Sequence, residues 1–449
     1  MLIINFFNTI NLLKKYYEDI SKVGINLSVV GFLTYLNGII QVTISKFYST
    51  EMVVATGLAT LLISFIISPL MVILYANQAL FARDFGISDK FKDERKNICI
   101  SSAIVFSLLV GFIFFLLFDL LSDAILYFLP EQSFKISHLI NSYIDIVKYS
   151  ILIVPLYFSL RGIFNGLGHS RYTLIMCGFE TTIAFIILAS IFLYTSILGH
   201  HLSEKNIIAL LSFTIIFSEL IGVFVGLFIL FHFKILNFKF LFFFKQFKVY
   251  LSDTYNFFTF NALQNTIGFG VYMYFSNLVA NVDSSLYSIY RLMTTIFSFN
   301  RFVVYGFRES NALFYAKKLY NKSLYEVKKQ HTLITVLISF FSNLICFFVF
   351  LFLFRSEVFL YFNFLLPVAI EFVVIEPVMA TLYMILIHCG CERVVSLFNI
   401  VVMSFYTLTL FFVKSYYYDF YLFYFSLTNL FVLMVGYIYI FKKNINSIK

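Results

Sequence analysis

The sequence predicts an all-α polytopic membrane protein, in which twelve transmembrane helices form two pseudo-symmetric six-helix lobes. Three observations support this fold class: the composition, twelve long apolar runs and an internal repeat. Of the 449 residues, 61% belong to the apolar set AVILMFWYC and only 12% are charged. A soluble protein covers its surface with roughly 25% charged residues, so most of this surface must face lipid.

The same composition excludes other classes of protein. Five cysteines in a chain of this length exclude a secreted disulfide scaffold, and the near absence of polar tracts excludes a disordered chain. The net charge of +9 does not indicate nucleic acid as a partner, because the cations lie in short clusters between apolar runs. That arrangement is typical of membrane topology.

Twelve apolar runs are long enough to cross a bilayer, because a hydrocarbon core of about 30 Å needs about 20 residues of helix. The runs are continuous and do not alternate, which favours helices over a β-barrel. They cover residues 26–46, 52–77, 98–121, 137–160, 172–196, 206–232, 255–280, 285–313, 331–354, 362–388, 394–414 and 419–441.

These runs divide the chain into two lobes and leave no room for a soluble domain. We predict an amino-terminal lobe over 25–232, a cytoplasmic linker over 233–254 and a carboxy-terminal lobe over 255–441. Residues 1–24 are interpreted as an interfacial amphipathic helix with no cleavable signal. Residues 442–449 form a predicted cytoplasmic tail.

The distribution of Lys and Arg predicts the orientation in the membrane. Of the 32 such residues, 23 lie on the side of the N-terminus and the even-numbered loops. The opposite side has five, namely Lys46, Lys135, Lys205, Arg355 and Lys414. The positive-inside rule then predicts a multi-pass protein of the cell (inner) membrane with both termini in the cytoplasm.

An internal repeat accounts for the two lobes. At an offset of 222 residues, 153–171 matches 375–393 at six of nineteen positions, where random pairing of so apolar a chain would give about two. The matches include Pro155 with Pro377 and Gly168 with Gly390. Six helices followed by six more, in parallel orientation, is the simplest account.

The two matched prolines predict bends in the fourth and tenth spans. Each proline lacks a backbone donor and frees the carbonyl four residues earlier, at Ile151 for Pro155 and at Val373 for Pro377. Because both halves place the proline equally, we expect both bends to line a central cavity. The alternative is that membrane spans tolerate proline generally.

Three segments resemble the multidrug and toxin extrusion (MATE) family. Residues 50–60 (TEMVVATGLAT) resemble the stretch that links its first two helices, and residues 161–171 (RGIFNGLGHSR) resemble the turn after its fourth helix. Residues 385–393 (ILIHCGCER) occupy the corresponding place after helix ten. The resemblance implies a twelve-helix, two-lobed exporter of the wider multidrug, oligosaccharidyl-lipid and polysaccharide superfamily.

Three positions bear on the acids that the family uses for ion coupling. Gln41 stands where many bacterial members have an aspartate in helix one, and Gly268 stands where some have a glutamate in helix seven. The resemblance therefore implies an altered amino-lobe coupling site. Glu376 stands in helix ten where many members have an aspartate, so that acid survives.

Charged residues within the spans are candidate site residues, because a charge at the bilayer centre is costly. Glu376 lies about twelve residues, or ~18 Å, from the cytoplasmic end of its span, and is the leading candidate for coupling; a structural hydrogen bond is the alternative. Glu180 in the fifth span is the amino-lobe candidate, with packing as its alternative. Arg291 and Arg301 in the eighth span could neutralise Glu376 or attract an anionic substrate, or could pair within the bundle.

Two clusters resemble metal sites, but we expect neither to bind metal. In the run 388–392 (HCGCE) the two thiols are only two residues apart and overlie the family's turn. The pair His200-His201 lies in an outer loop and is expected to be solvated. The predicted cofactor set is therefore empty, apart from H⁺ or Na⁺ as the coupling ion.

These observations predict a secondary active transporter that exports organic, cationic drug-like solutes by H⁺ or Na⁺ antiport with alternating access. No Gly-x-x-x-x-Gly-Lys motif is present, which argues against direct use of ATP. The alternative within the superfamily is a flippase for a lipid-linked oligosaccharide or polysaccharide precursor. Expected partners are a small organic molecule and the bilayer, and we expect a monomer.

Two further classes are less favoured. The major facilitator superfamily has Gly-x-x-x-Asp-Arg-x-Gly after its second helix, whereas residues 86–92 (GISDKFK) are one residue short and lack the second glycine. A membrane-embedded transferase needs a carboxylate or histidine cluster in a sizeable outer loop. Asp119, Asp123 and Glu131 lack such partners and are interpreted as a solvated rim, so we expect no enzymatic activity.

Overall fold

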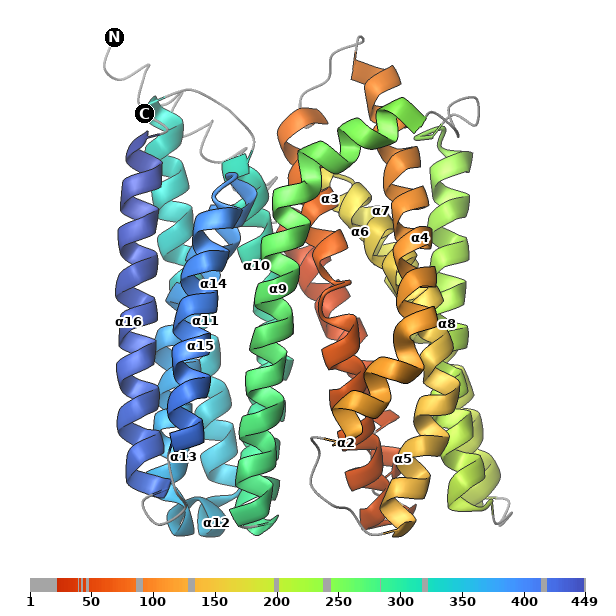
Figure 1. Ribbon diagram of the computed structural model, residues 1–449, viewed down its shortest axis with the longest axis vertical. Helices are drawn as coiled ribbons and strands as arrows, with labels where there is room; N and C mark the ends of the chain where they lie inside the picture. Colours follow the sequence, from red (N-terminus) through yellow and green to blue (C-terminus); the bar gives the residue numbers. More distant parts are fainter. Residues whose placement is uncertain are drawn as a thin grey trace. The chain divides into compact units, whose positions relative to one another are not determined.

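The computed structural model is helical throughout the part of the chain that it describes (Figure 1). That part comprises residues 22–38, 40–41, 43–45, 48–85, 92–127, 134–197, 202–236, 244–282, 284–316, 322–412 and 418–447. The predicted interfacial segment before residue 22 and the pair His200-His201 lie outside the described residues.

The chain forms two compact units. Unit 1 comprises Met1–Gly31 and Tyr274–Lys449, and unit 2 comprises Phe32–Met273. The first helix, Lys22–Ser45, starts in unit 1 and continues in unit 2.

Unit 2 is built from helices α2 to α8 and most of α9. Ser49 begins α2 and Ser203 begins α8, each accepting a hydrogen bond from a backbone N–H in the first turn of its helix. The helices are α2 (Thr50–Ile67), α3 (Val72–Phe85), α4 (Lys92–Tyr127), α5 (Phe134–Val147), the 3-10 turn η1 (Lys148–Leu152), α6 (Val154–Gly166), α7 (Ser170–Phe192), the π-helical turn η2 (Leu193–Ile197), α8 (Glu204–His232) and α9 (Phe244–Val282).

Unit 1 holds the remaining helices. In its core, Leu386 of α14 and Val395 of α15 pack with Tyr437 of α16. The helices are α10 (Ser284–Ala316), α11 (Lys322–Leu353), α12 (Arg355–Leu360), α13 (Phe362–Ile370), the π-helical turn η4 (Glu371–Ile375), α14 (Glu376–His388), α15 (Glu392–Phe412) and α16 (Tyr418–Ser447).

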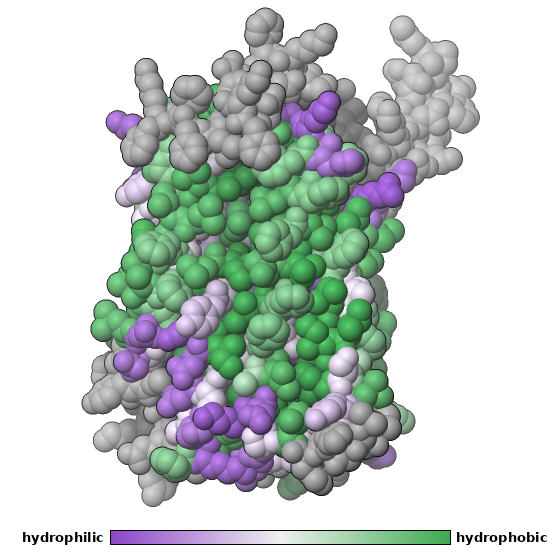
Figure 2. All heavy atoms as spheres, turned by 90° about the vertical axis from the view of Figure 1, so that its right-hand side faces the viewer, coloured by the Kyte–Doolittle hydropathy of each residue, from purple (hydrophilic) through white to green (hydrophobic). Residues whose placement is uncertain are grey.

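The surface of these helices is suited to lipid. Within the described residues, six helices are long and apolar enough to cross a membrane, and two bent pairs of helices would add two more spans. Large apolar side chains such as Leu116, Phe228 and Phe341 are more than half exposed. Figure 2 shows apolar side chains over the middle of one face, with polar side chains nearer its ends. Water would not stabilise such a band, whereas a hydrocarbon core would.

Pro155 lies at a break between two helical segments of unit 2. The segments Phe134–Leu152 and Val154–Gly166 meet at 44°, and proline lacks the N–H that would continue the α-helical pattern. Gly111 of α4 approaches this break closely, because a Cβ atom there would lie only 3.0 Å from the Ile151 carbonyl oxygen. The close approach packs a neighbouring helix against the bent segment.

Unit 1 accommodates Pro377 in another way. The span Phe362–His388 contains a π-helical turn at Glu371–Ile375, directly before the proline-containing first turn of α14. At the end of this turn the Glu376 N–H donates to the carbonyl of Glu371, five residues earlier. The hydrogen-bond register is therefore one residue longer than in an α-helix.

Candidate functional site

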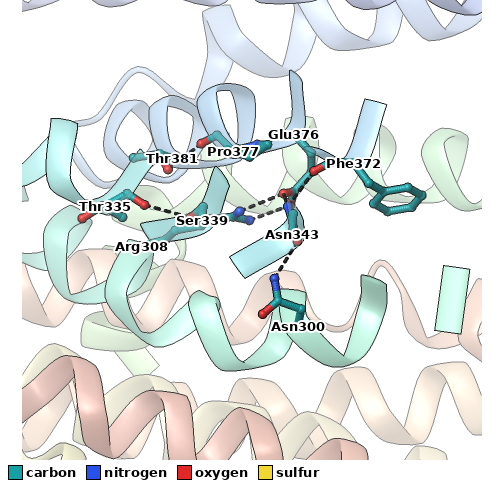
Figure 3. Close-up of polar contacts among 9 residues, drawn as sticks. All are labelled: Asn300, Arg308, Thr335, Ser339, Asn343, Phe372, Glu376, Pro377 and Thr381. Atoms are coloured by element: carbon teal, nitrogen blue, oxygen red, sulfur yellow. Dashed lines mark hydrogen bonds and ion pairs between the residues drawn. The ribbon is translucent and has the colours of Figure 1, made fainter. Parts of the chain in front are cut away.

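A buried ion pair lies within the helices of unit 1. Arg308 of α10 donates from Nη1 to Oε1 of Glu376 at 2.6 Å and from Nη2 to Oε2 at 2.8 Å. The two side chains are 3% and 6% exposed, so this bidentate contact is almost fully removed from solvent (Figure 3). Charge-assisted bonds of this parallel type are the strong ones, and they fix direction as well as distance.

Neutral polar side chains of α11 hold both members of the pair. Arg308 Nε donates to Ser339 Oγ at 3.2 Å, which orients the guanidinium plane. Asn343 Nδ2 lies 3.5 Å from Glu376 Oε2. Asn300 of α10 in turn donates to Asn343 Oδ1 at 2.6 Å and accepts from the Ser342 hydroxyl. Arg308 and Glu376 thus belong to a network that connects α10, α11 and α14.

Asn343 also donates a hydrogen bond to the backbone carbonyl that Pro377 leaves without a backbone donor. In the π-helical register the N–H of residue 377 would donate to the Phe372 carbonyl, but proline has no N–H. Asn343 Nδ2 supplies the missing bond to that oxygen at 2.6 Å. The sequence predicted the freed carbonyl at Val373, because an α-helical register was assumed; the π-helical turn shifts it by one residue.

The sequence reasoning did not identify Arg308 as the partner of Glu376. It named Arg291 and Arg301, which lie in α10 but whose side chains are outside the described residues. The signal was present, because Arg308 follows Arg301 by seven residues, about two helical turns. Both positions therefore lie on similar faces of α10.

A second buried carboxyl lies in unit 2. Glu180 of α7 is 7% exposed and accepts a hydrogen bond from the Tyr157 hydroxyl of α6. The same hydroxyl lies 3.0 Å from Cys177 Sγ, one turn before Glu180. The Arg161 guanidinium lies over the Tyr157 ring, 5.5 Å from its centroid, which is within the range of a cation–π contact.

Helix α8 approaches this carboxyl through a glycine. A Cβ atom at Gly222 would lie 3.0 Å from the Tyr157 ring and 3.5 Å from Cβ of Glu180. Glu219 is three residues earlier on α8, and its Oε2 atom is buried with no hydrogen-bond partner in the described part of the chain. Because residues three apart share a helix face, Glu180 and Glu219 bring two carboxyls to the same region of unit 2.

Gln41 and Gly268, which stand where the resemblance implied acids, both lie in unit 2. Gln41 is half-buried in the first helix, where its backbone carbonyl accepts from Ser45 Oγ at 2.9 Å. Gly268 is half-buried in α9.

The run 388–392, which resembled a metal site, forms the turn between α14 and α15. His388 is fully buried, and its Nδ1 atom bonds the Met384 carbonyl at 2.8 Å. The described residues contain no group of three or more His, Cys, Asp and Glu that could hold a metal ion.

Comparison with known proteins identifies the fold and a family to which part of the chain is similar. The MatE family model matches residues 27–191. A MOP superfamily transporter from Pyrococcus furiosus, described as having a reverse polarity of the binding pocket, is 15% identical with a TM-score of 0.74, and the match covers 96% of each chain. A crystal structure of MATE in the bent conformation is 14% identical with a TM-score of 0.70, and the match covers 98% of each chain.

A crystal structure of MATE in complex with MaL6 is 13% identical with a TM-score of 0.73, covering 96% of this chain and 97% of that chain. A search of curated protein sequences gives no significant match. The predicted all-helical, MATE-like membrane fold is confirmed by these full-length matches. The chain therefore has the all-helical membrane fold of MATE structures, and its residues 27–191 are similar to the MatE family.

Proposed function

We propose that this protein is a secondary active exporter of organic solutes, driven by the influx of H⁺ or Na⁺. Two six-helix lobes, over residues 25–232 and 255–441, open alternately to the two sides of the membrane around a substrate site. Binding of the coupling cation favours one of the two states, so that cation influx and solute export become linked.

The buried carboxyl of Glu180 is the observation that carries this proposal. A carboxyl inside a membrane protein is costly and marks a functional site by default. Glu180 lies midway along α7 and contacts a hydroxyl that also meets a thiol. Glu219, with one buried oxygen unpaired in the described residues, adds a second carboxylate to the same region. Oxygen-rich clusters of this kind can accept a proton or a hard cation.

Glu376 differs from Glu180 in having a permanent counterion. An arginine is not deprotonated in proteins, so a coupling cation at Glu376 would have to displace the Arg308 guanidinium from both carboxylate oxygens. We therefore assign cation coupling to Glu180 first, with Glu376 as the second candidate.

The proposal includes a location and an orientation. The excess of Lys and Arg on the side of the termini supports insertion into the cell (inner) membrane with both termini in the cytoplasm. A monomer would suffice, because both lobes belong to one chain. Labelling of introduced cysteines at Lys22 and Lys443 with a membrane-impermeant maleimide tests the orientation: protection in intact cells supports it, and labelling contradicts it.

A flippase for a lipid-linked oligosaccharide is the second candidate, and one specific observation favours it. Such a substrate carries a pyrophosphate, which requires cationic side chains within the helices. Arg308 is a buried cation of this kind.

The exporter proposal is tested with purified protein in proteoliposomes under an imposed H⁺ or Na⁺ gradient. We expect one of the gradients to drive flux of an organic probe, tested with both an ethidium-like cation and phenyl phosphate, and Glu180→Gln to abolish the dependence on the gradient. Glu204→Gln is the matched control. Glu204, at the start of α8, pairs with the exposed Lys135 of α5, so this variant should retain the coupling.

Three results would change the assignment. Full coupling in Glu180→Gln with loss in Glu376→Gln would move the coupling site to unit 1. Absence of gradient-driven flux in the wild-type protein would contradict an exporter. Translocation of a lipid-linked sugar in the same vesicles, without dye flux, would favour the flippase.

A further inference from the structure

The anion that pairs with the buried Arg308 guanidinium is a side chain of the same chain, Glu376. Its guanidinium forms three bonds, two to Glu376 and one to Ser339. A guanidinium has five N–H groups arranged as a rigid fork that matches a carboxylate or a phosphate. Because removal of an anion from a buried arginine is strongly unfavourable, any state in which Glu376 moves away requires another anion at the same place.

We propose that Arg308 is a substrate-binding residue, whose guanidinium takes up a carboxylate or phosphate group of the transported solute in exchange for Glu376. This inference rests on the proposed transport function and specifies the class of substrate. Exchange of one oxyanion for another keeps the charge and the hydrogen-bond geometry of the site. When no solute is bound, the Glu376 carboxylate pairs with the Arg308 guanidinium in place of the solute's anionic group.

The two members of the pair are anchored differently. Arg308 lies within the long continuous helix α10, and Ser339 of α11 fixes its guanidinium. Glu376 lies at the junction of the π-helical turn Glu371–Ile375 and the Pro377 turn. Figure 3 shows its carboxylate facing Arg308, with Asn343 alongside. The carboxylate is therefore the partner that can leave.

A change in the π-helical turn provides the movement. If the turn shifts from the π to the α register, the residue after it rotates by about 100° and translates by about 1.5 Å. Such a rotation would take the Glu376 carboxylate off the guanidinium. Asn343, which holds the Phe372 carbonyl of this turn at 2.6 Å, connects the backbone change to the polar network around the pair.

The neighbouring amides and hydroxyls suit an oxyanion. Asn343 already lies 3.5 Å from a carboxylate oxygen of Glu376. Asn300 and Ser342 follow in the same network and are neutral, so they impose no second charge on the ligand. The pair itself is almost fully buried, with the Arg308 and Glu376 side chains 3% and 6% exposed.

The test measures binding of phenyl phosphate and phenylacetate to the full-length protein in phosphatidylcholine nanodiscs, at constant ionic strength. Because the apparent affinity scales with the fraction of guanidinium that is free, we expect Glu376→Gln to bind both probes ~10-fold or more tightly than the wild-type protein. Arg308→Lys in the Glu376→Gln background should lose most of this gain, since an ammonium lacks the fork.

The double variant Arg308→Gln/Glu376→Gln keeps the test valid if Arg308→Gln alone does not fold, because it leaves no buried charge unpaired. It should bind neither anion. Lys135→Gln removes an exposed cation and is the matched control, with unchanged binding expected. Equal affinity of wild type and Glu376→Gln for the anions would overturn the inference, as would anion binding by the double variant that equals that of Glu376→Gln.

Two further arms separate the sources and the functions. Phosphatidic acid added to the nanodiscs competes with phenyl phosphate if the natural phosphate belongs to a lipid, and does not compete if it belongs to a water-soluble solute; both results support the anion site. Flux of the ethidium-like cation and of phenyl phosphate in proteoliposomes is measured independently of binding. If Glu376→Gln binds the anions more tightly than the wild-type protein but no flux is seen, the anion site is supported and the proposed transport is contradicted. If flux is seen but Glu376→Gln does not bind the anions more tightly, only the anion site is contradicted.

Discussion

Gly168 and Gly390 have the same backbone conformation, although they lie 222 residues apart, with φ values of +81° and +89°. The same two hydrogen bonds surround each glycine. The glycine itself donates to the carbonyl three residues back, from Gly168 to Asn165 at 3.0 Å and from Gly390 to Ile387 at 3.2 Å. The residue after it donates to the carbonyl five residues back, from His169 to Phe164 at 2.7 Å and from Cys391 to Leu386 at 2.9 Å. This pattern is a Schellman helix end, so the repeat found in the sequence is also a repeat of local structure.

Replacement of Gly168 by alanine should lower the stability. A positive φ costs a side chain about 1–2 kcal/mol, and a Cβ atom at Gly168 would meet no atom within 4 Å, so the loss would come from the backbone alone. Thermal unfolding, followed with a thiol-reactive dye, measures it. Gly178→Ala is the control: Gly178 is helical and also has open space around it, so this change should be neutral or stabilising. Equal behaviour of the two variants would contradict the prediction.

Gly162→Ala should be more damaging, for a steric reason. A Cβ atom at Gly162 of α6 would lie 2.5 Å from the Leu74 carbonyl oxygen and 2.9 Å from Cβ of Asn77, both in α3. Helices α3 and α6 would have to separate, at a cost of about 1–3 kcal/mol or more. The same unfolding assay applies, and a midpoint no lower than that of Gly178→Ala would show that the helices are not this close.

Arg308→Gln should destabilise unit 1 by about 3–5 kcal/mol, because it leaves the Glu376 carboxylate buried without its cation. The double variant Arg308→Gln/Glu376→Gln should recover much of this loss. Glu204→Gln, which breaks an exposed pair, is the control and should have little effect. Additive losses in the double variant would mean that the two side chains do not depend on each other.

Asn343→Leu should cost about 1–3 kcal/mol by leaving the Phe372 carbonyl without a donor. Pro377→Ala restores a backbone N–H at the position where the π-helical register requires one. In the Pro377→Ala background, Asn343→Leu should therefore cost clearly less. A double-mutant cycle in the unfolding assay measures the difference, and the same cost in both backgrounds would refute the role of Asn343 as the substitute donor.

Tyr157→Phe and Glu180→Gln should each reduce gradient-driven flux, and their effects should not be additive. The Tyr157 hydroxyl donates to the Glu180 carboxyl, so the second change removes little once the first has been made. Tyr149→Phe is a suitable control, because Tyr149 is 49% exposed. Flux measured in proteoliposomes decides the matter, and multiplicative losses in the double variant would indicate separate roles.

The sequence by itself determined that the protein is an all-helical membrane protein. Long apolar runs with 12% charged residues leave few other folds, because lipid offers no partner to an unpaired backbone group. It also determined where the chain departs from α-helical geometry, since Pro155, Pro377, Gly168 and Gly390 act through their own backbones. The mid-helix positions of Glu180 and Glu376 followed from counting residues along a span.

The tertiary structure decided which side chains meet. Helical periodicity places Glu376 on a face, but it does not say that α10 presents Arg308 to that face. It also does not reveal a π-helical turn, whose longer register depends on Asn343 binding the Phe372 carbonyl from α11. These contacts join residues far apart in the chain, and their geometry depends on how neighbouring helices pack. For that reason the sequence could propose Glu376 as a candidate site residue, and only the folded unit showed that Arg308 is its counterion.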